Sequence, residues 1–139
     1  MKTIKSISTI ISRKFLNPFE LQIWSNYFHS SVAFVTQPCL QLERFSEKKR
    51  MHILMNFKDM RKEMTHEIKD MWFTLGPWKG EFIPDLVGPF LEISAIPDAD
   101  IRMIIVPLFF DMAQCEFYCC EHLKTDLHGS NIQNTHNFL

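Results

Sequence analysis

The strongest periodic pattern of apolar residues runs over residues 46–75. Its members recur at steps of three or four: Ile53, Phe57, Met60, Met64, Ile68, Met71 (or Trp72) and Leu75. Such steps place side chains on one face of an α-helix. The pattern predicts one long helix, or two collinear helices with a single packing seam, starting near Ser46 and ending at Gly76-Pro77. Trp72, at the end of that seam, is expected to be buried against the following apolar helix.

Two shorter stretches also have helical periodicity. Residues 19–36 carry a broad apolar stripe. Asn17-Pro18 predicts the start of this helix and Gln37-Pro38 its end, because proline suits a first turn and pushes the preceding residue out of the helical region. Residues 82–94 predict a short apolar helix with a kink or a one-turn break at Gly88-Pro89.

A last helix is predicted to begin at Asp98, whose carboxylate would cap its first turn. It would run to about Leu123, bend at Pro107 and be followed by a polar, aperiodic tail over residues 124–139. Its buried face is predicted to comprise Ile101, Ile104, Ile105, Leu108, Phe109 and Met112.

The predicted fold class is all-α, since no stretch alternates as a half-buried strand does. About four main helices in two antiparallel pairs would form an α-solenoid-like fragment of the ARM/HEAT/TPR type. The length of 139 residues suits one domain, and 13 Phe against 4 Gly favours packed helices over a β-sandwich. The expected division is a basic segment over residues 1–18, helical repeats over 19–123 and the polar tail.

Charge and hydropathy exclude some functions. The net charge of −1 does not favour nucleic acid as a partner, and the longest apolar run, residues 103–110, is far shorter than a membrane span. Residues 1–15 hold four basic and no acidic side chains, with Ile4, Ile7 and Ile11 at helical spacing. This composition is typical of a mitochondrial presequence, but an ordinary basic helix, or a start inside a longer chain, is the favoured interpretation.

One group of residues has metal-binding chemistry. Cys115, Cys119 and His122 would share a helix face, because they are spaced by four and three residues. Structural zinc takes four ligands, usually from two short knuckles, and no second Cys/His pair is evident. These residues are therefore weak metal candidates, and reduced cysteines in the core or a groove are the favoured alternative. We expect no cofactor.

No catalytic motif is found. His66-Glu67 resembles the start of a metalloprotease helix motif, but Asp70 stands where the second histidine is needed. Lys48-Lys49-Arg50 could touch anionic lipid, yet three charges fall short of the roughly four to eight expected of a lipid-binding cluster. A soluble helix start is the favoured interpretation of that run.

Three segments carry a family resemblance: QPCLQLERFSEKKRMHILMNFKDMR, DMWFTLGPWKGEFIPDLVGPFLEISAIPDADIR and VPLFFDMAQCE. Over about residues 20–117 the chain resembles the dedicator-of-cytokinesis (DOCK) family, most closely the subgroup that works with ELMO proteins. Residues 57–61, FKDMR, correspond to a Tyr-Gly-Asp-Met-Arg block, and residues 109–112, FFDM, to a block of the same letters. Lys58 stands in place of the glycine, which favours continuation of the long helix.

The resemblance implies a central helical-repeat region of a guanine nucleotide exchange factor for Rac/Cdc42-class small GTPases. The exchange domain is expected to lie outside these residues, so no catalytic residue is assigned and the chain is not expected to be an enzyme. Its implied partners are the flanking domains of the full-length factor. A Rac-type GTPase, ELMO and the plasma membrane would be reached from the cytoplasm only through other regions.

Two interpretations of the whole chain remain open. It is either a scaffold segment, present as a fragment, an isoform or a truncated gene model of the exchange factor, or a free-standing helical adaptor. In the second case the basic N-terminus would direct it to an organelle.

Overall fold

The computed structural model describes the backbone of residues 2–133 and the side chains of residues 3–119. This part of the chain is all-α, as predicted, with more helices than the four expected. In chain order they are α1 (Lys2–Lys14), α2 (Leu21–Thr36), η1 (Pro38–Leu40), η2 (Leu42–Arg44), α3 (Glu47–Phe57), α4 (Met60–Thr74), η3 (Gly76–Phe82), α5 (Ile83–Ser94) and α6 (Ala99–Gln133). The η elements are 3₁₀-helices.

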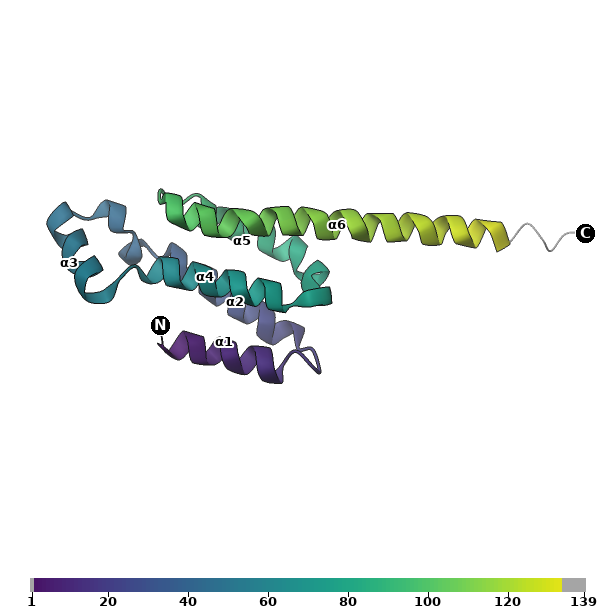
Figure 1. The fold of residues 1–139 in the computed structure, drawn as a ribbon, viewed down its shortest axis with the longest axis horizontal. Coiled ribbons are helices and arrows are strands. Elements are labelled where there is room, and N and C mark those ends of the chain that lie inside the picture. The colour runs from purple at the N-terminus through teal and green to yellow at the C-terminus, as the bar shows by residue number, and fades with distance from the viewer. Residues whose placement is uncertain (1, 134–139) are drawn as a thin grey trace, which may run out of the picture.

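The long helices run in alternating directions, so that α1, α2, α4, α5 and α6 form an antiparallel stack (Figure 1). α2 packs against α4 and α5, both of which also pack against α6, and α1 lies against α4 and α2. The centre of the core is an aromatic cluster. The ring centroid of Phe28 is 6.4 Å from that of Trp72 and 6.2 Å from that of Phe90, and the last two rings are 6.0 Å apart. All three side chains are fully buried, which confirms the predicted packing of Trp72 on α5.

The predicted helix over residues 46–75 is interrupted. α3 ends at Phe57, α4 begins at Met60, and α3 turns away from the axis of α4 (Figure 1). Lys58 has a φ of 58°, a conformation that favours glycine, and the Asp59 side chain accepts a hydrogen bond from the Arg61 backbone N–H and so caps α4. The expectation that Lys58 continues the helix was therefore wrong. The seam is buried only from Met64 onward, and Phe57 is 62% exposed.

The start predicted for α2 at Asn17-Pro18 was also wrong. These residues form the turn between α1 and α2, where Leu16 and Phe19 pair in an isolated β-bridge and the Asn17–Pro18 peptide is cis. α2 begins after Glu20. Gln37 is its C-cap, which confirms the predicted end.

α5 continues through Pro89 without the predicted break, and α6 continues through Pro107. Oδ1 of Asp98 accepts hydrogen bonds from the backbone N–H groups of Asp100 (2.9 Å) and Ile101 (3.1 Å), which confirms the predicted cap. The predicted face of α6 is buried, except that Phe109 is half-buried.

α6 does not end near Leu123 but runs to Gln133, so residues 124–133 are helical rather than a loose tail. An established helix adds each further residue at little cost, and no proline interrupts this segment. The rest of the predicted tail, residues 134–139, lies outside the described residues.

The basic N-terminal segment is part of the packed structure. Ile11 and Ser8 of α1 are buried, and the Ser8 hydroxyl donates a hydrogen bond to the Glu67 carboxylate of α4. Among the described residues, no helix is both long and apolar enough to cross a membrane.

Candidate functional site

Arg61, in the first turn of α4, is the most highly connected polar side chain among residues 3–119. It is only 1% exposed. Its Nη1 donates to Oε1 of Gln41 (3.1 Å) and Oε2 of Glu43 (2.8 Å), and its Nη2 donates to Oε1 of Glu43 (3.0 Å) and Oδ2 of Asp59 (2.9 Å). Nε donates to Oδ1 of Asp59 at 3.1 Å. A guanidinium has five N–H donors, and all five are used.

A second layer of charge joins this hub to the start of α6. Oδ2 of Asp98 lies 3.8 Å from Nη2 of Arg61 and 3.4 Å from Nζ of Lys62. Lys62 also forms a 2.6 Å ion pair with Asp100. The hub therefore connects three parts of the chain: the η1–η2 connection, the first turn of α4 and the α5–α6 turn.

Two of the acidic partners, Glu43 and Asp98, have lowered pKa values. Burial alone would raise the pKa of Glu43, but the hydrogen bonds and charge of Arg61 outweigh it and hold the pKa below its ordinary value. The pKa of Asp98 is likewise lowered despite partial burial, because the Ile101 backbone N–H and the Lys62 ammonium favour its carboxylate. Burial opposes the charge on Arg61, yet Asp59 and Glu43 raise its pKa overall.

A second polar junction joins α4, η3 and α6. Nε1 of Trp72 donates to Oδ2 of Asp111 at 2.7 Å, and Nζ of Lys79 lies 2.8 Å from the same oxygen. Lys79 also lies over the ring of Phe73, 4.6 Å from its centroid. This contact is a cation–π interaction, and it keeps the ammonium at the edge of the core.

Both junctions link helices. With five donors engaged by protein acceptors, Arg61 has none left for a phosphate or carboxylate ligand. Sequence reasoning missed Arg61 because its partners Gln41 and Glu43 are 20 and 18 positions away. The one sequence feature that could have pointed to Arg61 is that the QLE, FKDMR and PDAD segments each contain charged residues.

The metal candidates are only partly brought together. Cys115 is half-buried and Cys119 is exposed, and both are free thiols. The side chain of His122 lies outside the described residues. Burial and the nearby Asp111 raise the pKa of the Cys115 thiol, which disfavours the thiolate that a metal requires. Within the described side chains, no three His, Cys, Asp or Glu residues are arranged to hold a metal ion.

The segments that meet at these junctions are those on which the family resemblance rests. The profile of the dedicator of cytokinesis (DOCK) TPR region matches residues 1–128. The chain belongs to the dedicator of cytokinesis family. The match of this DOCK chain extends beyond the resemblance over about residues 20–117 and includes the basic segment over residues 1–18.

Individual DOCK relatives agree with this assignment. The chain is 44% identical over 115 residues to dedicator of cytokinesis protein 4 of Homo sapiens and of Mus musculus. It is 38% identical over 115 residues to dedicator of cytokinesis protein 3 of Mus musculus. These alignments cover 82% of this chain but only 6% of each relative. No solved structure matches the chain.

Proposed function

We propose that these residues form a scaffold segment of a DOCK-type guanine nucleotide exchange factor for Rac/Cdc42-class small GTPases. The supporting observation is the Arg61 hub. The polar residues of the family blocks point at one another and connect helices, and the guanidinium has no free donor for a ligand. In this proposal the segment positions neighbouring domains, and nucleotide exchange occurs elsewhere in the factor.

The proposal has consequences for partners and location. The direct partners of the helical segment are the flanking domains of the exchange factor. A Rac-type GTPase and ELMO are engaged by other regions, and the factor acts from the cytoplasm. Neither a cofactor nor a metal ion takes part, so Cys115 and Cys119 act as thiols within the fold.

Nucleotide release tests this proposal in two ways. The 139-residue chain alone should not accelerate release of a fluorescent nucleotide from Rac or Cdc42. Grafted in place of the matching region of human dedicator of cytokinesis protein 4, it should retain the release activity of that protein. Clear stimulation by the chain alone, or an inactive graft that is folded, would contradict the scaffold proposal.

A free-standing adaptor is the second candidate, because an apolar stripe on α6 is open to solvent. Met103 is 77% exposed and Phe110 is 69% exposed, and both lie on the face of α6 that points away from the core. Sequencing of full-length transcripts separates the two candidates. A reading frame that continues past Leu139 into an exchange domain supports the scaffold, and a stop codon there supports the adaptor.

A further inference from the structure

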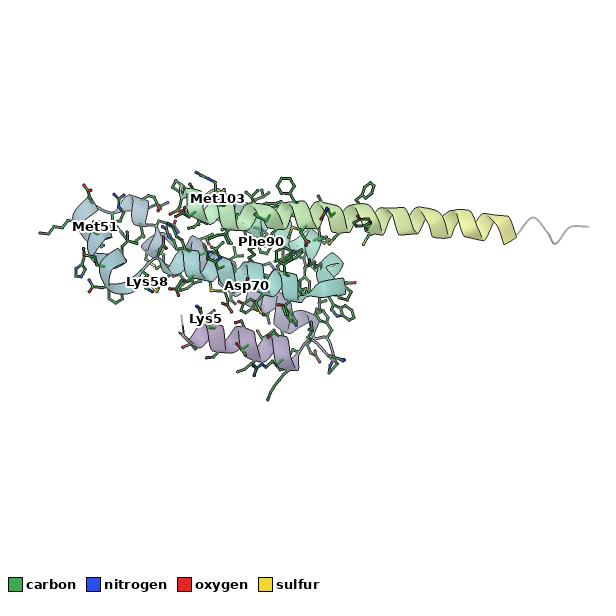
Figure 2. All side chains as sticks on the ribbon, viewed as in Figure 1. Lys5, Met51, Lys58, Asp70, Phe90 and Met103 are labelled. Atoms are coloured by element: carbon green, nitrogen blue, oxygen red, sulfur yellow. The ribbon has the colours of Figure 1, made fainter. Side chains whose placement is uncertain are left out.

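α6 has two apolar faces, and only one of them is covered. The covered face comprises the buried residues Ile101, Ile104, Ile105, Leu108 and Met112. On the opposite side of the helix, apolar side chains stand open to solvent at the edge of the stack, where Met103 is labelled (Figure 2). We call this second face the outer stripe; its members are Met103, Val106, Phe110, Ala113 and Phe117, all exposed. The core therefore does not account for apolar residues at these positions.

The outer stripe has the spacing of a coiled-coil seam. Its members follow one another at steps of three, four, three and four residues, which is the alternation of a and d positions in a heptad. At 3.6 residues per turn their side chains fall within an arc of about 80°. None of residues 103–117 that lies within this arc is charged. A seam of this kind buries its apolar side chains against a second helix.

A hollow in the outer stripe has the form of a coiled-coil hole. It has a volume of about 400 Å³ and is lined by Phe110, Ala113, Gln114, Phe117 and Tyr118. The first four are residues i, i+3, i+4 and i+7 of one helix, the kind of set that surrounds a knob side chain from a facing helix. Ala113 carries a single methyl group and lies between the two Phe positions along the helix, so the hollow fits one large apolar side chain.

Side-chain size alternates along the outer stripe, and this alternation selects the partner. The a positions hold the large Met103, Phe110 and Phe117, whereas the d positions hold the smaller Val106 and Ala113. In an antiparallel pair of identical helices each a position faces a d position, so every layer combines a large side chain with a small one. In a parallel pair like positions face each other, which sets Phe against Phe in one layer and Ala against Ala in the next. The outer stripe is therefore complementary to itself in the antiparallel direction.

We propose that the outer stripe pairs with the same stripe of a second copy of this chain, with the two α6 helices antiparallel. Phe110 of each copy enters the hollow at Ala113 of the other, and Phe117 of each copy packs on Val106 of the other. The contacts are reciprocal, as a two-fold interface requires. The inference does not rest on the exchange-factor proposal, because a scaffold segment and a free-standing adaptor could both carry this interface.

Charges beside the outer stripe agree with the antiparallel direction. Arg102 and Glu116 are exposed, and both occupy g positions on the same flank. Flanking charges of a coiled coil set partner choice and orientation. In an antiparallel pair g positions flank g positions, which brings Arg102 of each copy toward Glu116 of the other. In a parallel pair they would flank the e positions, Pro107 and Gln114, which carry no charge.

The length of the outer stripe sets the strength of the contact. From Met103 to Phe117 it spans about 21 Å along the helix. Stable complexes bury about 800 Å² on each partner, and one short seam covers less. We therefore expect a weak, reversible dimer whose population depends on concentration.

Sedimentation equilibrium of the full 139-residue chain over a concentration series tests the proposal, because a dimer saturates at twice the monomer mass whereas nonspecific aggregates keep growing. Phe110→Ala removes the side chain that fills the hollow and should weaken the dimer about tenfold or more. Ala113→Phe fills the hollow and should also weaken the dimer about tenfold, by overpacking. Nonspecific association predicts the opposite for Ala113→Phe, since this change makes the surface more apolar.

A mixture of the two variants is the sharpest measurement. One chain then supplies Ala at positions 110 and 113 and the other supplies Phe at both, so each layer again pairs a large side chain with a small one. The mixture should associate more tightly than either variant alone. The matched control is Ala33→Phe, the same change at an exposed position of α2, which should leave the dissociation constant unchanged. Circular dichroism should show unchanged helix content in every variant, because all three positions are exposed.

Energy transfer between dyes attached to the two C-termini tests the direction of pairing. It should be low, because antiparallel α6 helices place their C-terminal ends far apart, and high transfer would contradict the antiparallel arrangement. The proposal would also be overturned by a parent chain that stays monomeric, by tighter association of Ala113→Phe, or by a mixture that associates no better than its components. A monomeric parent would leave a helix of another protein as the occupant of the outer stripe. The nucleotide-release experiments are independent of all these outcomes.

Discussion

Nε1 of Trp72 donates a 2.7 Å hydrogen bond to Oδ2 of Asp111, and this bond joins α4 to α6 at the edge of the aromatic core. Lys79 contacts the same oxygen from η3. One carboxylate thus holds three elements together. Asp111 belongs to the FFDM block, and its role here accounts for a charged residue within an otherwise apolar part of α6.

Trp72→Ala should lower the free energy of unfolding by about 3–5 kcal/mol, since it removes a buried ring that packs on Phe28 and Phe90. Trp72→Phe keeps an aromatic ring but removes the donor to Asp111, so we expect a smaller loss of about 1–3 kcal/mol. Urea denaturation followed by circular dichroism measures both. An unchanged midpoint for Trp72→Ala would show that the packing of α4 on α5 is not as described.

Arg61→Gln removes a buried charge and should strongly lower the free energy of unfolding. It leaves the carboxylates of Asp59 and Glu43 without their common partner, and breaking a buried ion pair costs about 3–5 kcal/mol. Arg13→Gln makes the same chemical change at an exposed position and should stay within about 0.5 kcal/mol of the parent. Equal thermal midpoints for the two variants would contradict a structural role for the hub.

Stability should fall in acid. The pKa values of Glu43 and Asp98 are lower in the folded chain than their ordinary values, so their contribution is complete at neutral pH. It is lost as the pH falls through the lowered folded values, below about pH 4. Urea midpoints measured from neutral pH downward should show this loss. Arg61→Gln should flatten part of it, because Glu43 then titrates nearer its ordinary pKa, and an unchanged acid profile would contradict the assignment.

The isolated chain should self-associate through α6. Ile101, Ile104, Ile105 and Leu108 of α6 are buried, whereas Phe110 is 69% exposed and Phe117 is 60% exposed. Light scattering at tens of micromolar (roughly the range in which exposed apolar surface aggregates) should show species larger than a monomer. Phe110→Ser/Phe117→Ser should shift them toward monomer, whereas Met55→Ser on α3 should not. A monomeric parent chain would count against this expectation and favour the free-standing adaptor.

Local patterns in the sequence were sufficient for much of the helical framework. The apolar periodicity and the proline positions predicted the C-terminal end of α2, the residue range of α5 and the buried face of α6. Asp98 was also identified as the N-cap of α6. These features depend on interactions within one or two helical turns. A helix propagates until a local signal stops it, so nearby residues are informative about it.

Other features depended on the tertiary structure. The apolar steps through Ile53 and Phe57 continue those of α4, yet the chain breaks at Lys58-Asp59, where the Arg61 hub forms. The acceptors of Arg61 come from three separate segments of the sequence, represented by Glu43, Asp59 and Asp98. Each of these residues is charged, so each alone looks like a solvated surface residue. Burying a guanidinium is unfavourable unless every donor is satisfied, and only the folded chain brings enough acceptors to one point. The periodicity of a segment specifies which of its faces is apolar. Whether another element covers that face is decided by the packing of the whole chain. Here the packing buries the apolar face of α4 and leaves the apolar side chains of α3 open to solvent.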